Sequence, residues 1–122
     1  MDHVSKFEIP VDDLARAERF YSALFQWVIT SEQRIITAPS DNRGIPIIFG
    51  AINGSFKERR DFDHPLILVK VDSIEETLRM AETIGGRTIT PLHQRGEDGF
   101  FATIADSEGN IVGLWESLKV VD

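Results

Sequence analysis

Two ionisable side chains, Lys6 and Glu8, stand two residues apart near the start of the chain, in a segment whose alternation predicts a β-strand. Since side chains alternate between the faces of a strand, both point the same way. Together they could recognise a polar group or move a proton, and a solvated ion pair is the alternative. The sequence has no serine–histidine–acid triad, phosphate-binding glycine loop or dinucleotide fingerprint. Its lack of cysteine excludes a thiolate nucleophile, disulfides and cysteine-ligated metals.

The charge balance bears on which partners the chain can have. Its 122 residues contain 13 Lys and Arg against 20 Asp and Glu, a formal net charge of −7, which mildly favours a cationic ligand. The one basic cluster, Lys57–Arg60, contains Glu58 and is read as a solvated loop, so we expect no nucleic-acid binding. The sequence has no apolar run of about 18 residues and no signal peptide, which predicts a cytoplasmic protein without membrane contact.

The chain contains one internal repeat. Phe7–Leu14 is echoed by Ile67–Ile74, 60 residues later, with matching apolar positions and with Asp12 opposite Asp72. Each copy is an alternating strand that leads into a helix. The sequence therefore predicts a single domain over residues 1–122, with one module at about 4–53, a linker at about 54–65 and a second module at about 66–117.

Local signals place the helices and the later strands. Asp13 and Ser73 are the expected N-caps, Ser73 with Glu76 as a capping box, and Gly85 ends the second helix. The predicted buried helix faces are Leu14, Ala17, Phe20, Tyr21, Leu24 and Phe25, and Ile74, Leu78, Ala81 and Ile84. The predicted later strands are Arg34–Thr37, Ile45–Ile52, Arg87–Thr90, Gly99–Ala105 and Ile111–Trp115.

Two segments resemble a known family. Val11–Tyr21 (VDDLARAERFY) and Gly99–Ala102 with Asp106–Glu116 (DSEGNIVGLWE) are similar to the opening and closing motifs of the vicinal oxygen chelate superfamily. That superfamily includes glyoxalase I, bleomycin-binding proteins and extradiol dioxygenases. The resemblance implies an α+β fold. In it, two βαβββ modules form an incompletely closed, eight-stranded, barrel-like sheet with helices outside and a concave ligand-binding face.

The resemblance also implies where metal ligands would stand. Metal-using members carry them on the opening and closing strands of both modules, which here correspond to Lys6, Leu66, Gly113 and a position within Ile45–Ser55. A protonated lysine repels a cation, Leu66 and Gly113 have no donor, and Ile45–Ser55 contains no Asp, Glu or His. We therefore expect no metal and no other cofactor.

Alternation then predicts which residues face the concave side. The opening strands present Lys6, Glu8 and Pro10, and Leu66, Leu68 and Lys70, while Phe7, Ile9, Val11, Ile67, Val69 and Val71 pack on the helices. His3 and His64 are expected at the surface, and Glu116 on the opposite strand face as a structural or solvated group. His93, in a loop after Pro91 that borders the pocket in relatives, is a candidate ligand contact. The predicted pocket comprises Lys6, Glu8, His93, Phe101, Thr103 and Trp115.

Three functions fit this pattern. The first is a metal-free protein that binds a small molecule in its concave pocket, as bleomycin-binding relatives do. The alternative is an enzyme of the superfamily, a lyase, isomerase or dioxygenase, that uses metal-free acid–base chemistry or relocated ligands. The third is a structural or regulatory dimerising module. Exposed strand edges and the apolar Phe25–Trp27 segment predict a homodimer in every case.

Overall fold

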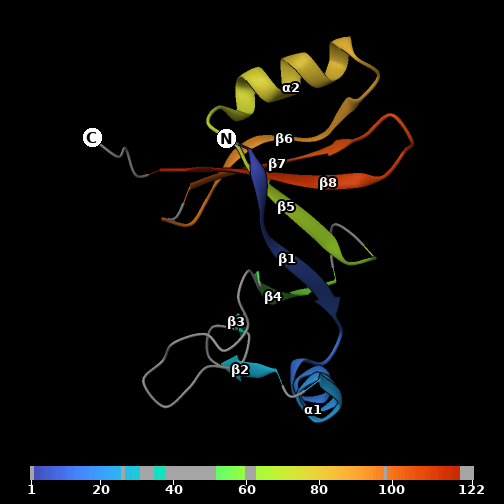
Figure 1. The fold of residues 1–122 in the computed structure, drawn as a ribbon, viewed down its shortest axis with the longest axis vertical. Helices are drawn as coiled ribbons and strands as arrows, with labels where there is room; N and C mark the ends of the chain where they lie inside the picture. Colours follow the sequence, from blue (N-terminus) through green and yellow to red (C-terminus); the bar gives the residue numbers. More distant parts are fainter. Residues whose placement is uncertain are drawn as a thin grey trace. The chain divides into compact units, whose positions relative to one another are not determined.

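A computed structural model describes residues 2–25, 27–30, 35–37, 52–59, 63–97 and 99–118. The chain divides into two compact units, a first unit of Lys6–Pro65 and a second unit of Leu66–Asp122 with Met1–Ser5. The described residues form two helices and an eight-stranded mixed sheet that hydrogen bonds do not close, which confirms the α+β prediction (Figure 1). Neither described helix is long and apolar enough to cross a membrane.

The first unit contains four strands and one helix. Its strand order is β2-β3-β4-β1, with β4 parallel to β1 and antiparallel to β3. Strand β1 begins in the second unit and continues here. The elements are β1 (His3–Val11), α1 (Leu14–Phe25), β2 (Val28–Thr30), β3 (Ile35–Thr37) and β4 (Asn53–Glu58).

The second unit repeats this connectivity. The opening strand β5 is parallel to the closing strand β8, and β8, β7 and β6 follow as antiparallel neighbours, with β6 at the edge. The predicted repeat is thus matched by the pairing of each module's first and last strand. The elements are β5 (Leu66–Lys70), α2 (Ile74–Thr83), β6 (Arg87–Arg95), β7 (Gly99–Ala105) and β8 (Ile111–Ser117).

Both helix N-caps are confirmed. The Asp13 carboxylate accepts the backbone N–H of Arg16 at 3.0 Å, and this hydrogen bond lowers the pKa of Asp13. Ser73 Oγ accepts the N–H of Glu76 at 3.2 Å. At the end of α2, Gly85 has a φ of 109°, the left-handed conformation that suits glycine.

The turn between β7 and β8 is fixed by one side chain. The Asp106 carboxylate accepts the backbone N–H groups of Asn110 at 2.8 Å and Glu108 at 2.9 Å, and these bonds lower the pKa of Asp106, with Asn110 contributing most. Gly109 turns the chain with a φ of 84°. As a result β7 coincides with the prediction, and β8 extends two residues beyond it.

Other strand predictions need correction. Strand β4 occupies residues that the sequence analysis assigned mostly to the linker, while the predicted Ile45–Ile52 strand lies outside the described residues except for Ile52, which is not in a strand. Strand β6 continues through Pro91 to Arg95, so His93 lies on a strand and not in a loop. Proline is tolerated there because β6 is an edge strand.

Each unit has its own apolar core on the helix side of its strands. In the first unit Ile9, Val11, Ile36 and Phe56 are buried and pack with residues of α1. In the second unit Val71, Ile74, Ala102 and Leu114 are buried, with Val69 packed against them. The predicted helix-facing sides of β1 and β5 are confirmed at these positions. Ile67 is an exception, because its side chain is 46% exposed.

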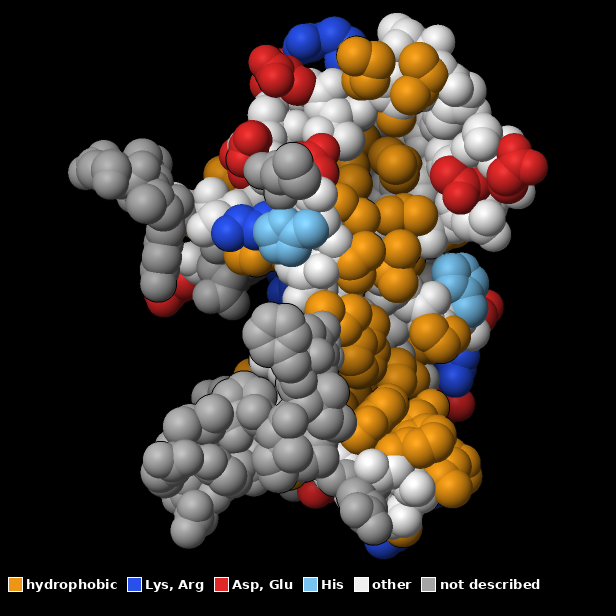
Figure 2. All heavy atoms as spheres, viewed as in Figure 1, with side chains coloured by type: hydrophobic (Ala, Val, Ile, Leu, Met, Phe, Trp, Pro, Cys, Tyr) orange, Lys and Arg blue, Asp and Glu red, His pale blue; other side chains and the backbone are white. Residues whose placement is uncertain are grey.

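The predicted buried faces of the helices are partly wrong. Leu14, Ala17 and Tyr21 pack on the first core, but Phe20, Leu24 and Phe25 are each more than half exposed. Phe20 lies about 100° around the helix from Tyr21, and the other two lie in the last turn. On α2, Ile84 is 71% exposed because it is already the C-cap. Figure 2 shows apolar side chains at the surface of both helices.

Candidate functional site

A row of four side chains crosses the second unit's sheet on one face. Lys70 of β5 is paired with Trp115 of β8, Trp115 with Phe101 of β7, and Phe101 with His93 of β6. Directly paired residues of neighbouring strands carry their side chains on the same face. These four residues, called here the cross-strand row, therefore place three of the six predicted pocket residues side by side.

Two cations lie against the rings of this row. Lys70 Nζ is 5.4 Å from the centroid of the Trp115 ring, and Arg95 Cζ is 3.9 Å from the centroid of Phe101. Both distances are within the range of cation–π attraction. The His93 ring meets Phe101 edge-on, with centroids 5.5 Å apart. Arg95 can lie over Phe101 because its own strand partner is Gly99, which has no side chain.

Hydrogen bonds hold the polar ends of the row. Trp115 Nε1–H donates to Ser5 Oγ at 2.7 Å, and the Ser5 hydroxyl donates to the backbone carbonyl of Leu68 at 3.3 Å. His93 Nδ1 lies 2.9 Å from the carbonyl of Pro91. These bonds fix the orientation of the indole and imidazole rings, so the row is a preformed surface.

Thr103, a further predicted pocket residue, lies on the same face as Phe101, and both side chains are buried, with 6% of each exposed. Its hydroxyl oxygen accepts the backbone N–H of Thr90 at 3.1 Å, at a point where the β6–β7 register shifts. The hydroxyl therefore satisfies a strand N–H that the irregular ladder displaces. We assign Thr103 the support of the row rather than a ligand contact.

The implied metal positions of the second unit are filled by leucine side chains. Leu66 and Leu68 are 1% and 0% exposed. A Cβ added at Gly113 would lie 3.0 Å from Leu68 Cγ and 3.2 Å from Leu66 Cδ2. None of these three residues has a side-chain N or O donor, and a side chain added at Gly113 would press against both leucines. The residues here do not fit a divalent metal.

The corresponding positions of the first unit are also poor ligands. Glu8 corresponds to Leu68 in the repeat and is paired with Ser55, so Ser55 is the counterpart of Gly113. The sequence analysis could place this ligand position only within Ile45–Ser55. The strand register identifies it as Ser55, which offers a hydroxyl group. Among the described residues, no three His, Asp or Glu side chains come together as a metal-binding group.

Glu8 is buried in the first unit, with 1% exposed, and is not the solvated rim group that the sequence left as an alternative. Lys57 Nζ of β4 lies 3.8 Å from Glu8 Oε2. Sequence reasoning missed Lys57 because it assigned the Lys57–Arg60 cluster to a loop, although Lys57 is a strand residue. Lys6 is half-buried. Glu8 is therefore ion-paired with Lys57, which lies two residues beyond Ser55 on β4.

Glu116, expected to be a structural or solvated group, has a structural role. Its Oε1 accepts the backbone N–H of Ile74, the first residue of α2, at 2.8 Å. A carboxylate at a helix N-terminus satisfies an otherwise orphaned N–H and complements the helix dipole. Glu116 therefore faces the helix side of the sheet, opposite the cross-strand row.

This role predicts the effect of two substitutions. We expect Glu116→Ala to lower the free energy of unfolding by about 1–2 kcal/mol, because the Ile74 N–H loses its acceptor. Glu116→Gln keeps an acceptor oxygen and should cost less than about half as much. Urea unfolding followed by circular dichroism measures both. Equal losses for the two variants would contradict the capping role.

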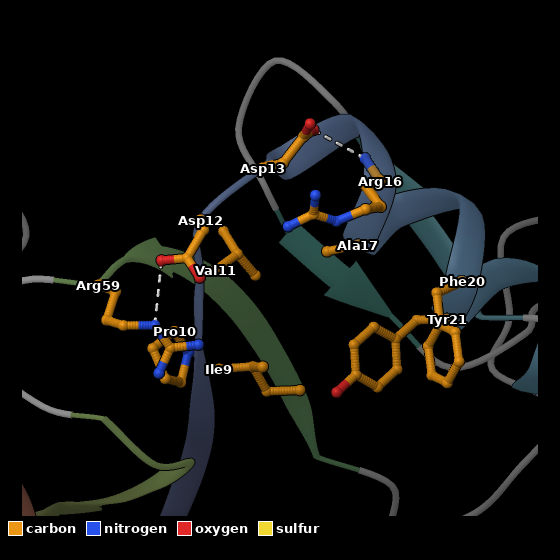
Figure 3. A pocket seen from close by; sticks show the side chains of 10 residues that line it. All are labelled: Ile9, Pro10, Val11, Asp12, Asp13, Arg16, Ala17, Phe20, Tyr21 and Arg59. Atoms are coloured by element: carbon orange, nitrogen blue, oxygen red, sulfur yellow. Dashed lines mark hydrogen bonds and ion pairs between the residues drawn. The ribbon is translucent and has the colours of Figure 1, made fainter.

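A cavity of about 290 Å³ lies on the helix side of the first unit (Figure 3). Ile9, Val11, Ala17 and Tyr21 supply apolar walls, and Arg16 of α1 and Asp12 line the cavity as charged residues (Figure 3). At the rim, Arg59 Nε pairs with Asp12 at 3.1 Å, and Asp13 caps α1. Arg59 is thus ion-paired within the unit. None of the six predicted pocket residues lines this cavity.

A second cavity, of about 500 Å³, lies along α2 in the second unit. Met80 and Ile84 form its apolar part, and Asp2, Asp72 and Glu76 carry negative charge around it. It too contains none of the predicted pocket residues. Neither cavity could be predicted from the sequence, because each depends on how a helix packs on its strands.

Comparisons with known proteins agree with this fold. A family model described as the Glyoxalase/Bleomycin resistance protein/Dioxygenase superfamily matches residues 1–114. No curated protein matches the chain. A hypothetical protein from Bacillus halodurans has a similar structure, with a TM-score of 0.66, 12% identity and coverage of 99% of this chain and 98% of that chain.

Two further solved structures carry functional or family names. A glyoxalase/bleomycin resistance protein/dioxygenase superfamily member from Vibrio splendidus has a TM-score of 0.60 and 8% identity, with 97% and 100% of the two chains covered. Methylmalonyl-CoA epimerase from Mycobacterium tuberculosis has a TM-score of 0.59 and 16% identity, with 95% and 88% covered. At these identities the likeness shows the fold alone.

Proposed function

This chain belongs to the Glyoxalase/Bleomycin resistance protein/Dioxygenase superfamily, and we propose that it binds a small molecule without a metal ion. The binding surface is the cross-strand row of the second unit. Its predicted members His93, Phe101 and Trp115 are joined by Lys70, and Thr103 lies next to Phe101 on the same face of β7.

The packing of Leu66 and Leu68 against Gly113 carries this proposal. It puts apolar side chains where metal-using members of the family place ligands. Beside it lie the half-buried ring of Trp115 and the buried ring of Phe101, each with a cation against it. Small-molecule sites are typically apolar and aromatic with a few oriented polar groups. The row supplies both components.

A fragment screen followed by proton–nitrogen correlation spectra tests the proposal. The chain has two tryptophans, and Trp27 lies in the first unit, stacked on Tyr21 with centroids 5.3 Å apart. The two indole N–H signals therefore report on different units, and Trp27→Phe assigns them. We expect hits that move the Trp115 signal in the presence of EDTA. Hits that move only Trp27, or that need an added metal, would contradict the proposal.

We expect no stoichiometric divalent metal at the implied positions. The reason is the donor set, which is a lysine, a serine, a leucine and a glycine at Lys6, Ser55, Leu66 and Gly113. The protein is incubated with Zn²⁺, Ni²⁺, Mn²⁺ or Fe²⁺, desalted and measured by elemental analysis. One ion retained per chain would overturn this expectation and support a metal-dependent lyase or dioxygenase.

A second candidate function, metal-free acid–base catalysis, is favoured by the burial of Glu8 with Lys57 3.8 Å from its carboxylate. A carboxylate that is excluded from water can accept a proton from a bound substrate, and the corresponding acid can donate one to it. Mass spectrometry of each confirmed ligand after incubation distinguishes the two functions. A product that forms with the protein and is lost in Glu8→Gln supports catalysis, and an unchanged ligand supports binding alone.

We also propose that the chain is a homodimer. Phe20 and Leu24 of α1 are each 58% exposed, and Val28 is 48% exposed, which is a substantial apolar surface on one unit. Light scattering at micromolar concentration should give twice the 13.7 kDa mass of the chain. Phe20→Ser with Leu24→Ser should give a single chain if α1 forms the contact. A wild-type protein of 13.7 kDa would rule out the dimer.

A further inference from the structure

We propose that the ligand of the cross-strand row is an anion, a flat organic molecule that carries a carboxylate. This inference rests on the proposed function and goes further by naming the chemical class of the ligand. It reverses the mild preference for a cation that the net charge of −7 suggests.

The charged side chains of the second unit's strands are segregated by sign. Strand β7 has none, and strands β5, β6 and β8 contain Lys70, Arg87, Arg95 and Glu116 together with His93. The one carboxylate, Glu116, points to the helix side, where it accepts the Ile74 N–H. Lys70 and Arg95 both lie on the row's rings. The charged side chains that these strands place on the row are therefore Lys70 and Arg95, and Glu97 follows Arg95 in the turn to β7.

The row offers a flat ligand two kinds of contact. The half-buried ring of Trp115 provides an aromatic surface against which a flat body can stack, and the buried Phe101 ring beside it lies under Arg95. Lys70 lies at the Trp115 end and Arg95 over Phe101, on long side chains that can turn toward a bound group. Ammonium and guanidinium groups make charge-assisted hydrogen bonds with carboxylates, and arginine can do so with two N–H groups.

The local charge decides the preference because the interaction is short-ranged. Exposed charges farther apart than about 8 Å are largely screened at physiological ionic strength, so distant carboxylates contribute little. A carboxylate in contact with Lys70 or Arg95 is much closer than that distance. The acidic surface of the protein affects how fast a charged ligand approaches, whereas the side chains of the cross-strand row determine whether a bound anion or cation is favoured.

Three probes that share one ring system test this inference: naphthoate, the neutral naphthamide, and the cationic naphthylmethylammonium. The Trp115 indole signal is followed in Trp27→Phe protein. We expect naphthoate to bind at least about tenfold more tightly than naphthamide, with naphthylmethylammonium weakest. Raising NaCl to about 1 M should weaken naphthoate and leave naphthamide unchanged.

Variants identify the cations responsible. Lys70→Met and Arg95→Met should each weaken naphthoate about five- to tenfold and leave naphthamide within about twofold. Lys70→Arg should restore naphthoate binding, because it keeps the charge. The control Arg16→Met, at the first unit's cavity, should have no effect.

The outcomes separate this inference from the proposed function. If naphthamide binds as tightly as naphthoate and both move the Trp115 signal, the anion preference is overturned and small-molecule binding at the row stands. If naphthoate leaves Trp115 unchanged and is weakened by Arg16→Met, it binds in the first unit's cavity, which also overturns the anion preference. The fragment screen then decides the proposed function independently.

Discussion

We expect Gly113→Glu to lower the free energy of unfolding by at least about 4 kcal/mol. The substitution restores the carboxylate that metal-using relatives carry at this position. Here its Cβ would lie 3.0 Å from Leu68 Cγ, and its charge would be buried against Leu66 and Leu68. An overpacked site combined with a buried carboxylate is among the most destabilising changes that one residue can make. Urea unfolding followed by circular dichroism measures the loss.

Two controls separate overpacking from charge. Gly113→Ala adds only the Cβ and should cost about 1–3 kcal/mol. Gln94→Glu adds the same charge at an exposed position of β6 and should change stability by less than about 0.5 kcal/mol. If Gly113→Glu were tolerated within about 1 kcal/mol, the site would have room for a ligand, and the case against a metal would fail.

We expect Phe56→Ala to cost about 3–5 kcal/mol of unfolding free energy, because truncating a buried phenylalanine loses its transfer energy and leaves a cavity. Phe56 is 0% exposed at the centre of the first unit's core, and its ring centroid lies 5.6 Å from that of Tyr21. Tyr21 in turn stacks on Trp27. The loss should therefore also appear as a change in the Trp27 indole signal.

Phe20→Ala is the matched control. Phe20 belongs to the same unit and meets the same tyrosine, with centroids 5.2 Å apart, but it is 58% exposed. Its removal should cost less than about 1 kcal/mol, since little of its surface leaves water on folding. Equal losses of stability in the two variants would contradict the difference in exposure between Phe56 and Phe20.

Features set by neighbouring residues could be predicted from the sequence. The caps at Asp13 and Ser73 are bonds between a side chain and the backbone three residues on, and both were confirmed. The period of two placed Phe101 and Trp115 on one face, because a strand that ends in clear turn residues has little freedom of register. The same alternation placed Lys70 on that face.

Features that depend on distant elements could not be predicted. Arg95 was missed because Pro91 was taken to end the strand, and only the position of β6 at the sheet edge makes a proline acceptable there. The pairing of Glu8 with Lys57 needs the parallel register of β1 and β4. The exposure of Phe20 depends on where α1 seats, because helical periodicity does not show how much of a face its neighbours cover.

Native mass spectrometry of the protein with naphthoate or a screen hit, in the presence of either EDTA or Zn²⁺, tests the central claim most directly. The claim is that a small molecule binds without a metal. We predict a species with the mass of the protein and ligand alone, at equal abundance under both conditions and reduced in Trp115→Ala. A complex that appears only with Zn²⁺, and that contains the ion together with the ligand, would contradict it.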